Sequence, residues 1–551
     1  MNPIWDDVFI DPKSVDTWRW FIIYTVDGSA GVWLEDFCPH SRLDLGIFWS
    51  MLQVNITLPS GKSTSLAVPQ SSKVGDVKIL AQKAFHQGFL RLVSADGHVL
   101  TDTSELLTSV GIQDGDQLTA IACPAQIASN SAAFAWWCCG SDGIVTWGDL
   151  DSGGDSSAVQ DQLRGVQHVQ ATCDAFAAIL ADGSVVTWGY RDFGGDSSAV
   201  QDQLRSVQQI HSTCYAFAAI LADGSVVTWG DPLYGGDSSG VQEQLRGVRQ
   251  VQSSNWAYDI DLTGGAFAAI LEDGSVVTWG DPGNGGDSSA VQGGLIDVQE
   301  IQATNGAFAA ILADGSVVTW GNENCGGDSS AVQDRLRNVQ RIQATLDSFA
   351  AILADGSVVT WGGPPYGGDS SAVQDQLRRV QQIQATAGAF AAILANGSVV
   401  TWGQPILGGD SSAVQDQLRG VQQIQAACRA FAAILADGSV VTWGDRDYGG
   451  DSSAVQGQLR SVQQVQSNNW ALETAVGRGA FSALRADGSV VTWGASYYGD
   501  YSEVQHELKG VQCIQATGQA FAAILADGSV ASWGAPSAGG DSSAVQEQLA
   551  A

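Results

Sequence analysis

The chain has 551 residues, 44% of them hydrophobic, which suffices for a large core but exceeds one ordinary domain unless the sequence repeats. It carries 58 Asp and Glu against 25 Lys and Arg, and a surface with a formal net charge of −33 repels nucleic-acid phosphates. Nine scattered Cys include no CxxC pair, so neither a disulfide framework nor a metal site is expected. We expect reduced thiols, no signal peptide or transmembrane segment, and a cytoplasmic or nuclear location, because the longest early apolar run spans only residues 21–24.

Residues 1–50 form an N-terminal extension of unknown structure that is rich in Trp. We expect it to pack on its neighbour. Its Trp residues are Trp5, Trp18, Trp20, Trp33 and Trp49.

Residues 51–123 form a separate unit with alternating apolar residues and one helical pattern. The predicted elements are strands at 51–58 and 63–68, a helix at 74–85, short strands at 90–93 and 98–100, and a closing strand at 118–122.

This order, with Ser-Gly-Lys at 60–62, Val-Lys at 77–78, the segment 100–106 and Gly-Ile-Gln at 111–113, resembles ubiquitin. The resemblance implies a small α+β ubiquitin-like β-grasp domain. Cys-Pro-Ala follows the last strand where ubiquitin has Gly-Gly, which implies a domain that is not conjugated to other proteins.

Residues 127–551 are dominated by ten copies of a phrase close to Ala-Asp-Gly-Ser-Val-Val-Thr-Trp-Gly. The spacing between copies is about 41 residues, and two copies carry nine extra residues around Trp256 and Trp470. A fixed period of this size indicates a propeller, a solenoid or another repeat array. The repeated residue is Trp147, Trp188, Trp229, Trp279, Trp320, Trp361, Trp402, Trp443, Trp493 and Trp533.

The copy that begins at Gln209 shows how one repeat folds. Strands are predicted at 209–213, 217–221 and 225–229, with an Asp-Gly turn between the last two. The segment 240–245 is predicted as a fourth, outer strand or a single helical turn. Because both faces of the middle strand are apolar or small, each sheet must be stacked between two neighbours, and the repeated Trp is expected to pack between them.

The phrases Ala-Phe-Ala-Ala-Ile-Leu, Asp-Gly and Val-Val-Thr-Trp-Gly resemble the regulator of chromosome condensation repeats, although the family His before the second strand is Phe here. The resemblance implies a β-propeller of the kind carried by large HECT-type ubiquitin ligases. That family usually has seven blades, so one ring of ten, seven plus three, and five plus five all remain open. The last segment, 544–549, is predicted to complete the first blade and close the ring.

The sequence predicts no catalytic site, no metal and no cofactor. Its six His form neither a metal-binding spacing nor a triad. The repeated Gly-Gly-Asp-Ser-Ser motif could suggest a calcium loop or a phosphate nest, but its presence in nearly every copy favours a structural turn.

We therefore expect a mainly β, non-catalytic interaction scaffold, an adaptor linked to the ubiquitin system, with protein partners and neither nucleic acid nor membrane. One alternative is a guanine-nucleotide exchange factor for a small GTPase. Another is a ubiquitin-ligase component, although the sequence shows no HECT or RING pattern. A light sensor would need a Gly-Trp-Arg-His-Thr phrase, which is absent.

Two stretches of the repeat vary between copies: the pair before the Phe strand and the four residues after Trp-Gly. Successive turns of an antiparallel sheet alternate between its two ends, so both stretches are predicted on one rim. Drift of unconstrained loops is the simpler explanation, but the rim is rich in residue types that anchor interfaces. The predicted partner-binding residues are Arg191, Phe193, Tyr234, Trp256, Tyr366, Arg446, Tyr448, Trp470 and Tyr498.

Overall fold

The computed structural model describes residues 51–85, 90–100, 105–122, 125–138, 143–254, 264–468, 478–495, 499 and 504–549, and the backbone of two earlier strands. The chain divides into two compact units, Met1–Phe85 with Leu90–Ala122, and His86–Phe89 with Cys123–Ala551. Strands β1 (Ile22–Val26) and β2 (Ser29–Trp33) pair antiparallel. The packing predicted for residues 1–50 lies outside the described residues.

From residue 51 on, the described part of the first unit holds a five-stranded sheet and one long helix, in the order expected from the sequence. Its elements are β3 (Met51–Thr57), β4 (Ser63–Pro69), α1 (Val74–Phe85), β5 (Leu90–Val93), β6 (Val99–Leu100) and β7 (Gln117–Ala122). The sheet order is β4-β3-β7-β5-β6, and β3 lies parallel to β7. Alternate residues of β3, such as Val54 and Ile56, are buried in one core with Val77 and Ala81 of α1, which confirms the alternation and the helical spacing.

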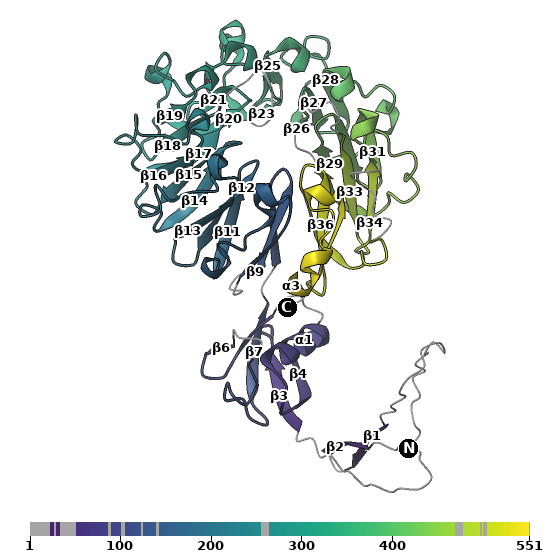
Figure 1. The fold of residues 1–551 in the computed structure, drawn as a ribbon. Helices are drawn as coiled ribbons and strands as arrows, with labels where there is room; N and C mark the ends of the chain where they lie inside the picture. The colour runs from purple at the N-terminus through teal and green to yellow at the C-terminus, as the bar shows by residue number, and fades with distance from the viewer. Residues whose placement is uncertain are drawn as a thin grey trace. The chain divides into compact units, whose positions relative to one another are not determined.

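The described residues of the second unit form ten three-stranded antiparallel sheets, here numbered repeats 1 to 10 in chain order (Figure 1). The first strands are β8 (Ala125–Ser129), β11 (Val166–Ala171), β14 (Val207–Ser212), β17 (Val248–Ser253), β20 (Val298–Ala303), β23 (Val339–Ala344), β26 (Val380–Ala385), β29 (Val421–Ala426), β32 (Val462–Asn468) and β35 (Val511–Ala516). The middle strands are β9 (Ala133–Cys138), β12 (Ala175–Leu180), β15 (Ala216–Leu221), β18 (Ala266–Leu271), β21 (Ala307–Leu312), β24 (Ser348–Leu353), β27 (Ala389–Leu394), β30 (Ala430–Leu435), β33 (Ala480–Arg485) and β36 (Ala520–Leu525). The third strands are β10 (Ile144–Gly148), β13 (Val185–Gly189), β16 (Val226–Gly230), β19 (Val276–Gly280), β22 (Val317–Gly321), β25 (Val358–Gly362), β28 (Val399–Gly403), β31 (Val440–Gly444), β34 (Val490–Gly494) and β37 (Val530–Gly534).

The segment after each third strand forms turns, so the predicted fourth element is helical rather than a strand where the chain is described. In repeat 2 it begins with the short 3-10 helix η3 (Arg191–Phe193). Side chains then fix it: Ser197 donates to Gln201 Oε1 at 2.9 Å, and Gln201 Nε2 donates to the Val185 carbonyl at 2.9 Å. The Asp-Ser-Ser motif is therefore a structural turn, as its repetition indicated.

Neighbouring sheets pack face to face through both sides of the middle strand. Phe217 and Ala219 lie in a core with repeat 2, whereas Ala218 and Ile220 lie in the next core, with repeat 4. The repeated Trp joins the same interface, as predicted: Trp229 stacks on Phe217 with ring centroids 5.1 Å apart, and its Nε1 donates to the Gly194 carbonyl of the preceding repeat at 3.0 Å.

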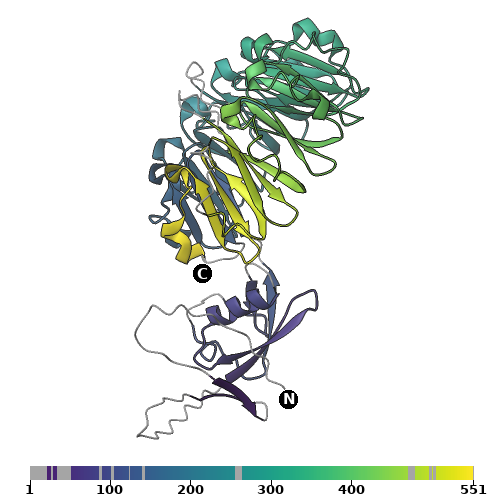
Figure 2. The same cartoon turned by 90° about the vertical axis from the view of Figure 1, so that its right-hand side faces the viewer.

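The sheets close into a single ring of ten, which settles the three arrangements left open by the sequence. Ten buried clusters each join two consecutive repeats, and one of them joins repeat 10 to repeat 1. Across that closing interface Trp147 Nε1 donates to the Gly539 carbonyl at 3.0 Å. The last strands, in yellow, accordingly lie beside the first, in blue, in both views (Figures 1 and 2).

The closing segment packs on repeat 1, as predicted, but as a helical turn and not as a strand. Repeat 1 already has three strands, and residues 544–549 add no strand to it. They form the end of the 3-10 helix η14 (Ser543–Val545) and the short helix α3 (Gln546–Leu549), and Leu549, only 1% exposed, packs beside Ile127 and Trp136 of repeat 1. First strands contact first strands around the whole ring, β35 to β8 included.

Candidate interaction rim

Both variable stretches lie at the same end of each sheet, as the alternation of turns predicted. In repeat 2, Ala175 pairs with Gly189, so the turn before β12 and the loop after β13 are adjacent. Thr172 Oγ1 donates to the Phe193 carbonyl at 3.0 Å and ties them together. We call this end of the ring the loop rim. An equivalent bond is donated by Thr213, Ser254, Thr304, Thr345, Thr386 and Thr517.

Backbone hydrogen bonds also run along the loop rim from one repeat to the next. Ser131 N donates to the Cys173 carbonyl at 3.1 Å, and Cys173 N donates to the Cys214 carbonyl at 2.8 Å. The same bond links Asn305, Leu346, Ala387 and Cys428 in series, and Gly518 N donates to the Ser131 carbonyl across the closure. Since these bonds use main-chain atoms, the side chains at these positions can differ without loosening the rim.

The opposite, Asp-Gly end is constant for a packing reason. Gly183 has φ of +78°, and a Cβ there would lie 2.7 Å from the Ser206 Cα of the next repeat. Its carbonyl also accepts a hydrogen bond from Val207 N at 2.8 Å. The Asp-Gly turns are constant because they pack against the next sheet. The contrast with the variable loops at the other end is therefore not by itself evidence that those loops bind a partner.

The structure brings two of the predicted residues together in one aromatic cluster. Phe193 stacks on Tyr215 at 3.8 Å between ring centroids, and Tyr215 meets Tyr234 edge-on at 4.7 Å. Tyr190 extends the row by stacking on Phe193 at 4.6 Å. Our prediction missed Tyr190 and Tyr215, although both lie in the variable stretches that identified the others.

Two thiols, Cys173 and Cys214, lie beneath this aromatic row and are buried. The hydrogen bond with Cys214, together with burial, raises the pKa of Cys173 well above its ordinary value. A thiol held protonated is a poor nucleophile, so this pair gives no support for covalent chemistry.

The remaining predicted residues are spread around the rim rather than gathered. The Arg429 guanidinium lies over the Tyr448 ring, with its Cζ 4.9 Å from the ring centroid. This pair is four or more repeats away from the aromatic row. Arg191 and Arg446 are exposed but each pairs with a carboxylate of its own repeat, Asp196 at 2.8 Å and Asp451 at 3.1 Å. Trp256, Trp470 and Tyr498 lie outside the described residues.

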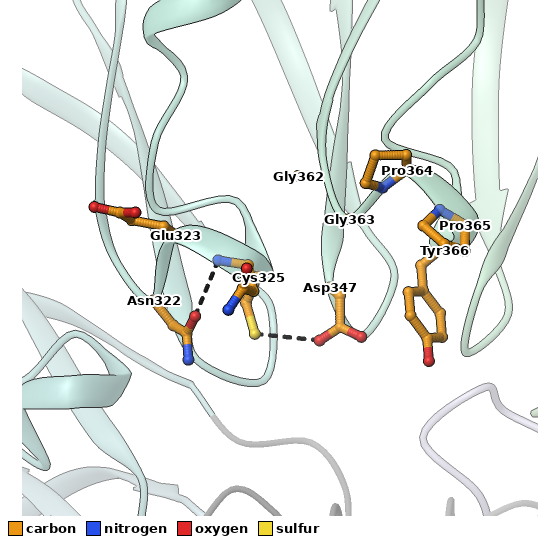
Figure 3. Close-up of a pocket in the computed structure, with 10 residues that line it drawn as sticks. Asn322, Glu323, Cys325, Asp347, Gly362, Gly363, Pro364, Pro365 and Tyr366 are labelled. Carbon is orange, nitrogen blue, oxygen red and sulfur yellow. Dashed lines mark hydrogen bonds between the residues drawn. The ribbon is translucent and has the colours of Figure 1, made fainter.

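Tyr366 lines an open hollow of about 440 Å³ between the loops of repeats 5 and 6 (Figure 3). Asp347 lies between the two loops, and Cys325 Sγ donates to its Oδ1 at 3.2 Å. Asn324 N donates to Asn322 Oδ1 at 3.0 Å and shapes the other wall. The lining carries two carboxylates, Glu323 and Asp347, and one thiol, Cys325, which is hydrogen-bonded to Asp347.

Within the described residues there is no group of three or more His, Cys, Asp or Glu side chains placed to hold a metal ion. Nor does any described helix have the length and apolar character needed to cross a membrane.

No protein-family model matches the chain, and no curated protein matches it. Solved structures do. They include the computationally designed protein Ika8 (15% identity, 60% of this chain and 95% of that one, TM-score 0.26). Another is the ectodomain of the Physcomitrella patens receptor kinase CR4 (16% identity, 52% of this chain and 74% of that one, TM-score 0.30). A third is Prp20p from Saccharomyces cerevisiae (14% identity, 58% of this chain and 82% of that one, TM-score 0.29).

A ubiquitin-like domain of an Arabidopsis thaliana protein is also similar, at 17% identity over 16% of this chain and 92% of that one, with a TM-score of 0.13. At these scores the assignment of a β-propeller rests on the ten sheets and the closing interface of the chain itself.

Proposed function

We propose that this chain is a non-catalytic protein-interaction scaffold that binds a protein partner on the loop rim of its propeller. The observation that carries the proposal is the exposure of large apolar side chains at the tips of neighbouring loops. Leu150, Tyr190 and Leu233, from repeats 1, 2 and 3, are 71%, 44% and 61% exposed. Exposed apolar side chains grouped on a rigid frame are typical of protein interfaces.

The link to the ubiquitin system is the finer part of this proposal, and it depends on the unit at 51–122. Ile121 is 42% exposed on β7, opposite Arg91 of β5. Both alternate with core residues, Ala120 and Leu92, so they lie on the sheet face that points away from the core. This face is the surface we assign to ubiquitin-handling proteins, with the propeller holding a second partner.

Affinity capture with the full chain tests both parts. The rim variant carries Leu150→Ser, Tyr190→Ser and Leu233→Ser, the control carries Ile296→Ser and Ile406→Ser, and the third variant carries Ile121→Asp. We expect the rim variant to lose one set of proteins that the control retains. We expect Ile121→Asp to lose a different set that contains ubiquitin-handling proteins. If the unchanged chain and the three variants all captured the same set of proteins, the proposal would be refuted.

A further inference from the structure

The exposed apolar tips of repeats 1 to 3 form one connected surface. Ser152 Oγ, in the loop that carries Leu150, donates to Asp174 Oδ1 at 3.0 Å, and Tyr190 N donates to the Asp174 carbonyl at 2.8 Å. From Tyr190 a row of contacting rings continues through Phe193 and Tyr215 to Tyr234, the neighbour of Leu233. We call Leu150, Tyr190, Phe193, Leu233 and Tyr234 the apolar arc.

The arc is held rigidly. Tyr215, only 6% exposed, lies between Phe193 and Tyr234, and backbone bonds join the loops of repeats 1, 2 and 3. Asp231 further fixes the Leu233 loop by accepting a hydrogen bond from Leu233 N at 2.9 Å. A surface that is ordered before binding loses little conformational entropy when a partner docks.

The loops that carry the arc are acidic. Residues 149–152, 172–174, 190–196, 213–215 and 231–236 contain six Asp and one Arg, a net charge of −5. The single cation, Arg191, is paired with Asp196. Hydrogen bonds from Ser198, and then Arg191, lower the pKa of Asp196, so this carboxyl is ionised at neutral pH.

The same rim offers a less acidic counterpart. Ile406, 57% exposed, occupies in repeat 7 the position that Leu233 occupies in repeat 3. The matching loops, 322–325, 345–347, 363–369, 386–388 and 404–409, contain one Glu, two Asp and no Lys or Arg, a net charge of −3. The loops of repeats 1 to 3 are therefore more acidic than those of repeats 5 to 7, and they carry three exposed apolar tips where the latter carry Ile406.

We propose that the apolar arc binds a basic amphipathic segment of a protein partner, with apolar side chains of the segment on Leu150, Tyr190 and Leu233 and its Lys or Arg residues beside the surrounding carboxylates. This inference rests on the proposed function and names the partner class of the same surface. Charge complementarity selects a cationic peptide, because nucleic-acid phosphates and anionic lipid headgroups are repelled by the same carboxylates.

Fluorescence anisotropy with the full chain and synthetic peptides tests the inference. The probe is a labelled peptide that repeats Lys-Leu-Leu-Lys four times, compared with versions in which Glu replaces Lys or Ser replaces Leu. We expect the first peptide to bind, each altered peptide to bind at least about tenfold more weakly, and affinity to fall as salt is raised.

The protein variants separate the arc from general acidity. Leu233→Ser and the triple rim variant should weaken binding of the Lys-Leu peptide at least about fivefold, whereas Ile406→Ser, the matched change, should alter it less than twofold. An equal loss of affinity in Leu233→Ser and Ile406→Ser would overturn the inference. So would a peptide with Ser in place of Leu that binds as tightly as the Lys-Leu peptide. If captured cellular partners depend on the arc while this peptide does not bind, the partner class is wrong and the proposed function stands.

Discussion

Closure of the ring predicts that the last Leu of the array matters as much as its internal equivalents. Leu549 and Leu204 occupy the same position in their repeats, and they are 1% and 0% exposed. Leu204 packs between repeats 2 and 3, and Leu549 between repeats 10 and 1. Replacing a buried Leu by Ala removes its transfer free energy and leaves a cavity, which costs about 2 to 5 kcal/mol.

We therefore expect Leu549→Ala and Leu204→Ala to lower the free energy of unfolding by similar amounts, within about 1 kcal/mol of each other. In an open solenoid the last Leu would have no partner beyond its own repeat, and its replacement would cost less than about 1 kcal/mol. Guanidinium unfolding followed by Trp fluorescence measures both, and the first transition is compared if there is more than one.

A loss of 2 kcal/mol or more in Leu204→Ala beside less than about 0.5 kcal/mol in Leu549→Ala would refute closure. Deletion of residues 538–551 is the stronger form of the same test. It removes Leu549 and the Gly539 carbonyl that accepts from Trp147, and an unchanged melting temperature would contradict the ring.

Three further changes test other contacts. Arg379 has φ of +56° at the position where repeat 8 has Gly420 at +65°. Arg379→Gly should therefore stabilise the protein by about 1 kcal/mol, and Gly420→Arg should destabilise it by a similar amount, as measured by thermal unfolding. Destabilisation by the first change or stabilisation by the second would contradict this reasoning. Trp188→Phe leaves the buried Gly153 carbonyl of the preceding repeat without its donor, and should lower the free energy of unfolding by about 2 to 4 kcal/mol in denaturant titrations. A loss below about 0.5 kcal/mol would contradict the role of this hydrogen bond. Burial, and then the nearby His168, lower the pKa of His211; the unfolded chain therefore binds more protons below its ordinary value of 6.5, and stability falls as pH drops through that value. His211→Gln, the residue of most other repeats, should remove this loss between pH 8 and 5 in urea titrations, and an unaltered pH profile would exclude the assignment.

The sequence was sufficient to place the strands because every repeat contains the same alternating apolar residues and the same Asp-Gly turn. Val185 to Gly189 follows an Asp-Gly turn and alternates, and the structure has β13 there. The segment that begins at Ala199 was ambiguous because it alternates and also has helical spacing. Its outcome depends on Gln201 reaching the Val185 carbonyl, a tertiary contact that no local pattern contains.

The number of blades in the ring could not be predicted, because nearly identical interfaces give no information about the rotation between sheets. The pattern of Phe217 and Ala218 shows that both faces are covered, which is equally true of a ring and of an open array. The closing contact joins Trp147 to Gly539, 392 residues apart in the chain. Only the accumulated rotation over ten interfaces brings them together.

For the same reason the sequence identified the varied rim but not the meeting of its side chains. Phe193 and Tyr234 were predicted together with Tyr366 and Tyr448, yet only the first two share a cluster. They meet through Tyr215, and that depends on how closely two neighbouring sheets approach.

The division of work within the repeat explains how this rim can vary. The buried strands and the Asp-Gly joints are fixed by packing, since a Cβ on Gly183 would overlap the Ser206 backbone. The loop rim is held instead through main-chain bonds such as the one from Cys173 N to the Cys214 carbonyl, which any side chain permits. Side chains such as Leu150 and Leu233 therefore change at little cost in stability while their positions stay fixed. A surface with variable chemistry on a constant frame is suited to acquiring partners, which is why we propose this rim as the partner-binding site.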